Sequence, residues 1–311
     1  MKEKNVDKLR VSEIITVQIV NHMFSHGVAQ GKPEFRLTEL KSAMRYWWRA
    51  CSCFGNIKDM KTEESKLFGS TSNSSPFLLK YVEQDKNENY NPVEKEINEY
   101  IRERAIPPDA EISFILQLRK NDKDTTESLL QRYKNIVYLV SLLGGLGRYS
   151  RKGQGVFYIK NTKLVSTKEE IVKKIKTMIK IVANKERTFQ DIKGEFYSGF
   201  KCNYKKDGGK ILYYPYIEEI IVGDAILVNE FDNRIKSTLA VRNKDGRQYN
   251  FSGERYACPI YITCYPADES NKVFPIIVVL NNTTLNSKEI KNCKELYQQF
   301  KEDCIKEMMK K

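Results

Sequence analysis

In the first half of the chain, apolar residues recur at the spacing of a β-strand in some segments and at the spacing of an α-helix in others. A helix is predicted from Thr38, as its N-cap, to about Cys53. A second helix should follow the capping box at 124–127 and end at Gly144-Gly145. β-Branched and apolar runs predict four strands, at 11–20, 76–82, 111–118 and 155–159. The order β-α-β-β-α-β is that of the ferredoxin-like split unit, which the RNA-recognition fold also uses.

The second half repeats this order more faintly, after a basic bridging helix at 168–182. A weak helix is expected at 231–241, and a last helix after Ser287. Strands are predicted at 216–222, 259–265 and 273–280. We therefore expect an α+β chain of two tandem ferredoxin-like domains, 1–165 and 166–311, the second lacking its closing strand. The polar insertion at 84–103 carries both signs of charge and is expected to be a mobile surface loop.

The net charge of the protein limits the kinds of partner that it is expected to bind. The formal net charge is +13 and the pI is about 9.2, which favours nucleic acid, an anionic membrane or an acidic partner. A lysine-rich proteome is the alternative explanation. The longest apolar runs are far shorter than the ~20 residues that cross a bilayer, and the N-terminus has no signal-peptide core. We expect a cytoplasmic protein that does not bind membranes, with seven reduced cysteines and no cofactor.

The first helix combines cations with tryptophan. Lys41, Arg45 and Arg49 recur every four residues and form one stripe on an α-helix. Both tryptophans of the protein, Trp47 and Trp48, lie between them. We expect the three cations and Trp48 to hold a polyanion against a rigid support.

A glycine-rich loop follows the second helix. Glycine lets backbone N–H groups approach a phosphate, and the neighbouring cations supply charge. A helix C-cap followed by a flexible hairpin is the alternative. The order helix, glycines, strand excludes a dinucleotide-binding loop, and no Gly-Lys-Ser/Thr step supports a Walker loop. The candidate RNA-binding residues of the loop are Gly145, Gly147, Arg148, Arg151, Lys152, Gly153 and Gly155. We expect this loop and the cationic stripe to converge on one groove.

These motifs, in this order, resemble the RAMP superfamily of CRISPR effector proteins, and among them the first subunit of the type III-B (Cmr) complex. The likeness rests on Lys41-x-x-x-Arg45-Tyr-Trp-Trp-Arg49, on Leu67-Phe-Gly-Ser70 and on the loop 144–155. A late Arg255-x-x-Cys-Pro259 step has Cys where the family usually has Ser, and the 21–27 segment departs from the family's loop.

The resemblance implies a non-catalytic subunit that seats the 3′ region of the guide RNA and its target duplex in antiviral defence. Its partners would be guide (CRISPR) RNA, target RNA and other RAMP subunits of the effector complex. A purely structural adaptor that meets an acidic protein is a further possibility.

Other polar groups allow competing interpretations. His22 and His26, spaced i and i+4, could cleave RNA as in metal-independent guide-processing endoribonucleases, although structural roles are favoured. Cys51 and Cys53 are too poorly spaced for zinc, and no metal site is expected. The acidic group Asp59, Glu63 and Glu64 is interpreted as an internal salt bridge to Arg45 or Arg49.

Overall fold

The computed structural model describes residues 11–27, 33–52, 54, 57–82, 93–98, 101–119, 126–183, 189–193, 198–202, 215–244, 250–251, 254–255, 259–281, 298 and 301–310.

The first half builds an antiparallel sheet with helices on one face. Its strands are β1 (Ser12–Ile19), β2 (Phe77–Tyr81), β5 (Glu111–Leu118) and β6 (Phe157–Ile159), in the spatial order β2-β5-β1-β6. Helices α1 (Leu37–Cys51) and α3 (Thr126–Leu143) complete the predicted β-α-β-β-α-β order. The four strand predictions and both helix predictions are confirmed to within a few residues.

Buried and more exposed residues alternate along the strands, so that one face of this sheet is buried. Ile15, Val17 and Ile19 of β1 are buried, whereas Ile14 is 61% exposed on the opposite face. Helix α1 begins at Leu37, with Arg36 at the N-cap position and no side-chain cap. The prediction of Thr38 as the cap was therefore wrong, and Glu39 in the first turn provides the favourable charge at this helix end instead.

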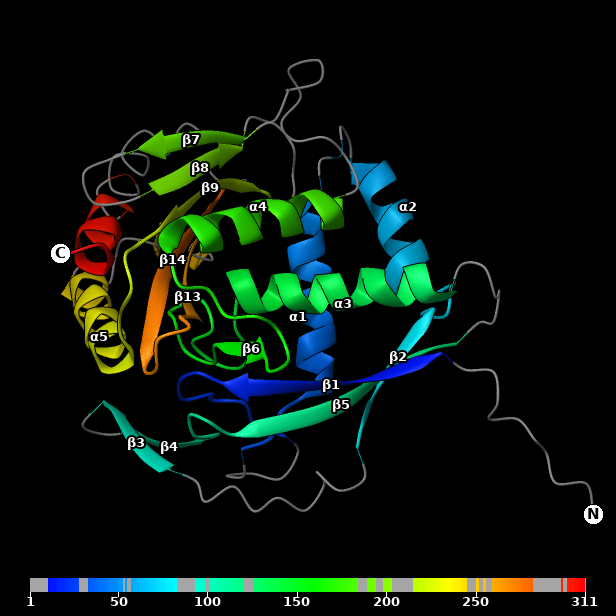
Figure 1. Ribbon diagram of the computed structural model, residues 1–311, viewed down its shortest axis with the longest axis horizontal. Coiled ribbons are helices and arrows are strands. Elements are labelled where there is room, and N and C mark those ends of the chain that lie inside the picture. Colours follow the sequence, from blue (N-terminus) through cyan, green and yellow to red (C-terminus); the bar gives the residue numbers. More distant parts are fainter. Residues whose placement is uncertain are drawn as a thin grey trace, which may run out of the picture.

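Two elements of the first half were not predicted. Helix α2 (Ile57–Phe68) packs beside α1 and is short and strongly charged, so its apolar period is weak. The polar insertion, expected to be a mobile surface loop, contains a hairpin of β3 (Val93–Asn98) and β4 (Ile101–Ala105) (Figure 1).

The second half forms another sheet, which the bridging helix α4 (Lys168–Ala183) precedes. Strand β14 (Lys272–Leu280) pairs with β13 (Ile260–Pro266) along one edge and with β9 (Ile217–Val222) along the other. The order β13-β14-β9 is that of the first three strands of a split unit. Strand β8 (Ser198–Cys202) pairs with β9 in the place of a fourth strand, although it precedes β9 in the chain.

The remaining elements lie around this second sheet. They are the edge strand β7 (Phe189–Lys193), the short β10 (Ile226–Leu227), α5 (Val228–Lys244), the pair β11 (Asn250–Phe251) and β12 (Glu254–Arg255), and a helix at 301–308. The predicted cap at Ser287 lies outside the described residues. The arrangement as two tandem ferredoxin-like domains, with a boundary at residue 165, stays a prediction.

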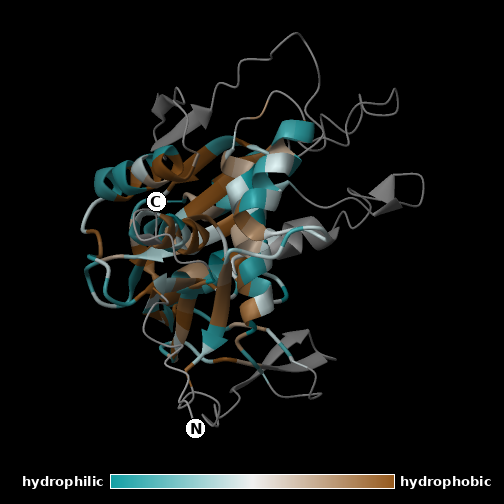
Figure 2. Ribbon diagram, turned by 90° about the vertical axis from the view of Figure 1, so that its right-hand side faces the viewer, coloured by the Kyte–Doolittle hydropathy of each residue, from teal (hydrophilic) through white to brown (hydrophobic). Residues whose placement is uncertain are grey.

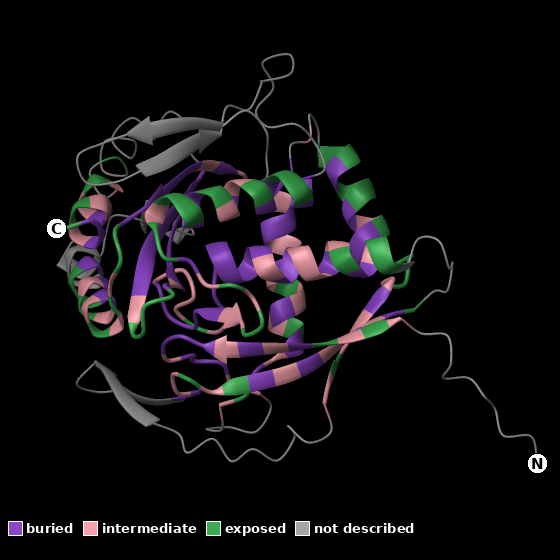
Figure 3. Cartoon of the chain, viewed as in Figure 1, coloured by how far each residue is buried: buried purple, intermediate pink, exposed green. Residues whose placement is uncertain are grey.

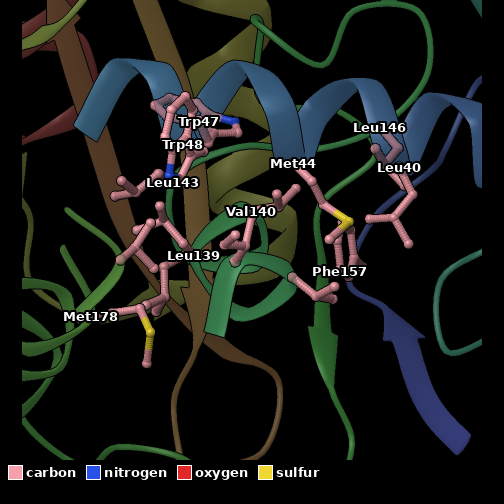
Figure 4. Packing of buried hydrophobic residues seen from close by; sticks show 14 of the residues in the cluster. Leu40, Met44, Trp47, Trp48, Leu139, Val140, Leu143, Leu146, Phe157 and Met178 are labelled. Carbon is pink, nitrogen blue, oxygen red and sulfur yellow. The ribbon is translucent and has the colours of Figure 1, made fainter. Parts of the chain in front are cut away.

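One hydrophobic cluster extends across that boundary. Helix α3 contacts α1, α4 and β13 of the second sheet, and α1 crosses behind α3 in Figure 1. Apolar residues concentrate on the strands and inner helix faces, whereas the outer side of α4 is exposed (Figures 2 and 3). Trp47 and Trp48 point from α1 towards Leu139 and Leu143 of α3 (Figure 4). Among the described helices, none combines the length and apolar content needed to cross a membrane.

Candidate nucleic-acid interface

The glycine-rich loop is tightly folded, and its shape requires glycine. Gly147 and Gly155 have φ angles of +82° and +68°, where a side chain is strained. A Cβ on Gly155 would lie 1.9 Å from the Leu146 carbonyl oxygen, and one on Gly147 would lie 2.6 Å from the Phe24 carbonyl oxygen. These glycines let the loop pack against itself and against the segment after β1, so the alternative of a flexible hairpin does not fit.

Much of the loop backbone is already hydrogen-bonded within the protein. The N–H groups of Leu146 and Gly155 donate to Gly155 and His22 carbonyls at 3.0 Å each. The Arg148 N–H donates to the Phe24 carbonyl at 2.7 Å. The expectation that backbone N–H groups cradle a phosphate is therefore wrong at these positions.

A buried asparagine fixes the loop to the end of β1. Asn21 is fully buried, and its Nδ2 donates to the Gly153 carbonyl at 2.6 Å while its Oδ1 accepts from the Val156 N–H at 3.1 Å. A Cβ on Gly153 would meet Ile235 of α5 at 2.5 Å, so this part of the loop faces the core. No sequence pattern pointed to Asn21, because its partners lie more than 130 residues away.

A groove of about 450 Å³ separates α1 from the glycine-rich loop. Gly145 and Gly147 lie in its wall, whereas Gly153 and Gly155 do not. Its lining comes from one arc of α1, from the loop and from β13: Glu39, Ser42, Ala43, Tyr46, Trp47, Gly145, Leu146, Gly147, Arg148, Ser150, Arg151 and Tyr261. Segments from both halves of the chain therefore form it.

Three loop cations lie over aromatic rings beside this groove. The Arg148 Cζ and the Lys152 Nζ lie 5.0 Å and 5.2 Å from the centroid of the Tyr149 ring. The Arg151 Cζ lies 5.2 Å from the Tyr261 ring centroid. A cation within about 6 Å of a ring face is held there by the ring quadrupole. The loop thus presents pre-positioned positive charge next to a cleft.

Two tyrosines were missed by the sequence analysis. The rings of Tyr46 and Tyr261 lie 5.6 Å apart, and their hydroxyl groups are hydrogen-bonded. Burial raises the pKa of the Tyr46 hydroxyl, Tyr261 adds to the rise, and the charges of Arg151 and Arg49 oppose it. Tyr46 is therefore a neutral hydrogen-bonding group between two arginines. Tyr46 stands in the tryptophan motif, but only the fold brings Tyr261 to it.

The stripe on α1 faces α2 and β2 instead of the groove. Arg45 donates from Nη2 to the Gly69 carbonyl at 2.9 Å, and its Nε lies 3.2 Å from Glu64 Oε1. Arg49 Nε lies 3.9 Å from Glu64 Oε2, and Lys41 Nζ lies 4.9 Å from the Phe77 ring centroid. The predicted internal salt bridge is confirmed for Glu64.

The expectation of convergence on one groove was wrong for Lys41 and Arg45. Tyr46 lines the groove. Successive residues of an α-helix are rotated by about 100°, so the Trp48 side chain is rotated by ~200° from that of Tyr46. Trp48 is 2% exposed and packs against Phe54 and Phe68, so its proposed place on the binding surface is also wrong. Arg49 alone of the stripe is close enough to act on Tyr46 in the groove.

The two histidines lie in an extended segment. Isolated bridges join Phe24 to Arg148 and His26 to Pro33, and the segment is not helical, so the i, i+4 spacing does not place the two histidines on one face. Among the described residues, no group of three or more His, Cys, Asp or Glu could hold a metal ion. Cys51 is buried, whereas Cys53 and the 256–258 part of the Arg-x-x-Cys-Pro step lie outside the described residues.

Part of the chain matches a known protein family. The model of the RAMP superfamily matches residues 16–158, from β1 to β6. A CRISPR system Cmr subunit, Cmr1-2 of Pyrococcus furiosus, is 38% identical over 75 residues, which span 23% of this chain and 40% of that protein.

Two solved structures share the fold. The apo crystal structure of Cmr1 from Pyrococcus furiosus superposes with a TM-score of 0.54 at 17% identity, covering 93% of this chain and 96% of the other. A chain of a cryo-EM structure of type III-B Cmr-beta, bound to cognate target RNA and AMPPnP in the presence of ssDNA, gives 0.53 at 13% identity, covering 96% and 99%. Residues 16–158 therefore match the RAMP superfamily, and the chain resembles the first subunit of the Cmr complex.

Proposed function

We propose that this protein is a non-catalytic RNA-binding subunit of a type III-B CRISPR effector complex. It would seat the 3′ region of the guide RNA and its target duplex, and it would assemble with other RAMP subunits in antiviral defence. The family, the relative named as a Cmr subunit and the shared fold support this proposal.

The observation that carries the proposal is the row of aromatic-backed cations along the groove. Arg148, Arg151 and Lys152 are clustered within five residues, and Arg148 and Arg151 line the groove. Guanidinium groups bind phosphate oxygens in a bidentate way, and the rings limit the side-chain entropy lost on binding. Such contacts position a backbone without reading its sequence.

The α1 wall of the groove carries a carboxylate. Glu39 accepts hydrogen bonds from the Ser25 hydroxyl at 2.8 Å and from Arg36 at 3.3 Å. Its negative charge disfavours a phosphate there, so the phosphates of a bound strand would follow the loop side. Tyr46 and Ser42 would then face the ribose, because both carry hydroxyl groups on the α1 side.

Ultraviolet crosslinking tests this assignment. The protein is purified from its native host with its bound RNA, irradiated and digested, and the crosslinked peptides are identified by mass spectrometry. We expect crosslinks at Tyr149 and Tyr261, and CRISPR repeat-derived sequences in the RNA. Crosslinks confined to the outer strands of the second sheet, or RNA without CRISPR sequences, would contradict the proposal.

A further inference from the structure

A second group of cations lies on the side of α1 that faces away from the groove. We propose that Lys41, Arg119 and the serine-rich loop 70–75 form a second phosphate-binding site for an RNA backbone, separate from the groove. This inference rests on the proposed function, because it takes RNA as the ligand.

Two cations from different elements meet around Phe77. Lys41 projects from α1, and its Nζ lies 4.9 Å from the Phe77 ring centroid. Arg119 follows β5 directly, where Leu118 pairs with Phe77 and the Arg119 N–H donates to the Pro76 carbonyl at 2.8 Å. The backbone pairing thus places Arg119, an exposed residue, beside the start of β2.

Few opposite charges among the described residues lie near this group. Within the part of the chain that the structure describes, neither Lys41 nor Arg119 has a carboxylate oxygen within 4.0 Å. Glu64 is already shared between Arg45 and Arg49. Burial lowers the pKa of Lys41, and the charges of Arg45 and Arg119 lower it further. Like charges held together at a cost to stability are typical of a site that binds the opposite charge.

The loop beside these cations offers hydroxyl donors. Gly69, with φ of +81°, turns the chain out of α2, and the Arg45 guanidinium holds the Gly69 carbonyl. Ser70, Thr71 and Ser72 are exposed, and the loop is closed by the Ser70 N–H donating to the Asn73 carbonyl at 2.8 Å. Serine and threonine hydroxyls commonly donate to phosphate oxygens, so cations and donors are combined in one place.

Helix α1 separates this site from the groove. Lys41 lies two residues from both Glu39 and Ala43, which line the groove, and so points about 160° away from them around the helix. The helix with its side chains is roughly 10–12 Å thick. One phosphate cannot contact both sites, so a dinucleotide, which has a single bridging phosphate, would fill only one of them.

Salt-dependent binding tests the second site. The variant K41Q/R119Q is compared with wild type and with the control K66Q/K134Q, whose lysines are paired with Glu63 at 2.7 Å and Glu13 at 2.6 Å. For a single-stranded RNA of about 30 nucleotides, we expect the slope of log K against log salt to become shallower by about 1.4, or about 0.7 for each cation lost. The control variant should leave the slope unchanged.

Three further readouts separate the possible outcomes. A dinucleotide held by the groove should bind K41Q/R119Q as it binds wild type, and removing the repulsion should leave the melting temperature unchanged or higher. An unchanged slope with the long RNA, or a lower melting temperature with unchanged binding, would overturn the second site.

Loss of affinity for another complex subunit, without a change in RNA slope, would instead assign these residues to a protein contact and overturn the second site. Failure of the wild-type protein to bind either RNA would refute the proposed function itself.

Discussion

Replacing Arg151 by Gln tests the groove most directly. The Arg151 side chain contacts the face of Tyr261, whereas its backbone carbonyl accepts from the Ile262 N–H at 3.1 Å. The substitution removes the charge and leaves that backbone hydrogen bond in place. We therefore expect the fold and the loop to persist.

The expected loss of RNA affinity follows from the counterions that are released when a cation binds a phosphate. Each phosphate contact on a single strand contributes about −0.7 to the slope of log K against log salt. Between 50 and 200 mM salt, a fourfold change, one contact accounts for a factor of about 2.6 in affinity. The variant R148Q/R151Q/K152Q removes three cations, so its slope should be shallower by about 2.1, which corresponds to about 18-fold over the same range.

Fluorescence anisotropy with a labelled single-stranded RNA measures these slopes over 50–400 mM salt. Lys66→Gln is the matched control, because Lys66 is exposed but is paired with Glu63 on α2. An affinity loss with no change in slope would show that the three loop cations act through structure rather than through phosphate contact, and would refute the reasoning.

Three further predictions concern stability. Trp48→Ala should lower the free energy of unfolding by about 3–5 kcal/mol in urea titrations, because the indole fills the core; weaker RNA binding at unchanged stability would contradict this. Gly155→Ala should unfold at markedly lower urea, because its Cβ would lie 1.9 Å from a carbonyl oxygen, and a wild-type midpoint would refute the close packing. Burial raises the pKa of Tyr133, so the unfolded state loses the phenol proton first and stability falls as pH rises above about 10. Tyr133→Phe should reduce that alkaline loss by up to about 1.4 kcal/mol per pH unit, and an unaltered pH profile would count against it.

The sequence predicted the fold well where apolar periods are strong. Strands β1, β5 and β14 and helix α4 have regular patterns, and their predicted bounds were close. Helix α2 and the β3–β4 hairpin are rich in charge, so the pattern that identifies an element is weak there. Where the apolar period is weak, the amino-acid composition of a segment does not show whether it forms a helix or a strand.

The site was predicted less completely than the fold. The glycine-rich loop and its cations were found because they are contiguous in the chain. The direction of the α1 stripe was not, because one carboxylate, Glu64, draws Arg45 and Arg49 towards α2. Tyr261 joins the groove because β13 contacts the glycine-rich loop, where the Ile262 N–H donates to the Arg151 carbonyl, and nothing local to its sequence marks it.

The presence of Tyr261 in the groove has a thermodynamic consequence. A ligand bound between α1, the loop and β13 would hold the two sheets together, since it contacts residues that each sheet positions. By linkage, its binding free energy would add to the resistance of the whole chain to thermal unfolding, by RT ln(1 + [L]/Kd). Conversely, any event that pulled β13 away from α3 would release the bound strand without touching a single loop cation.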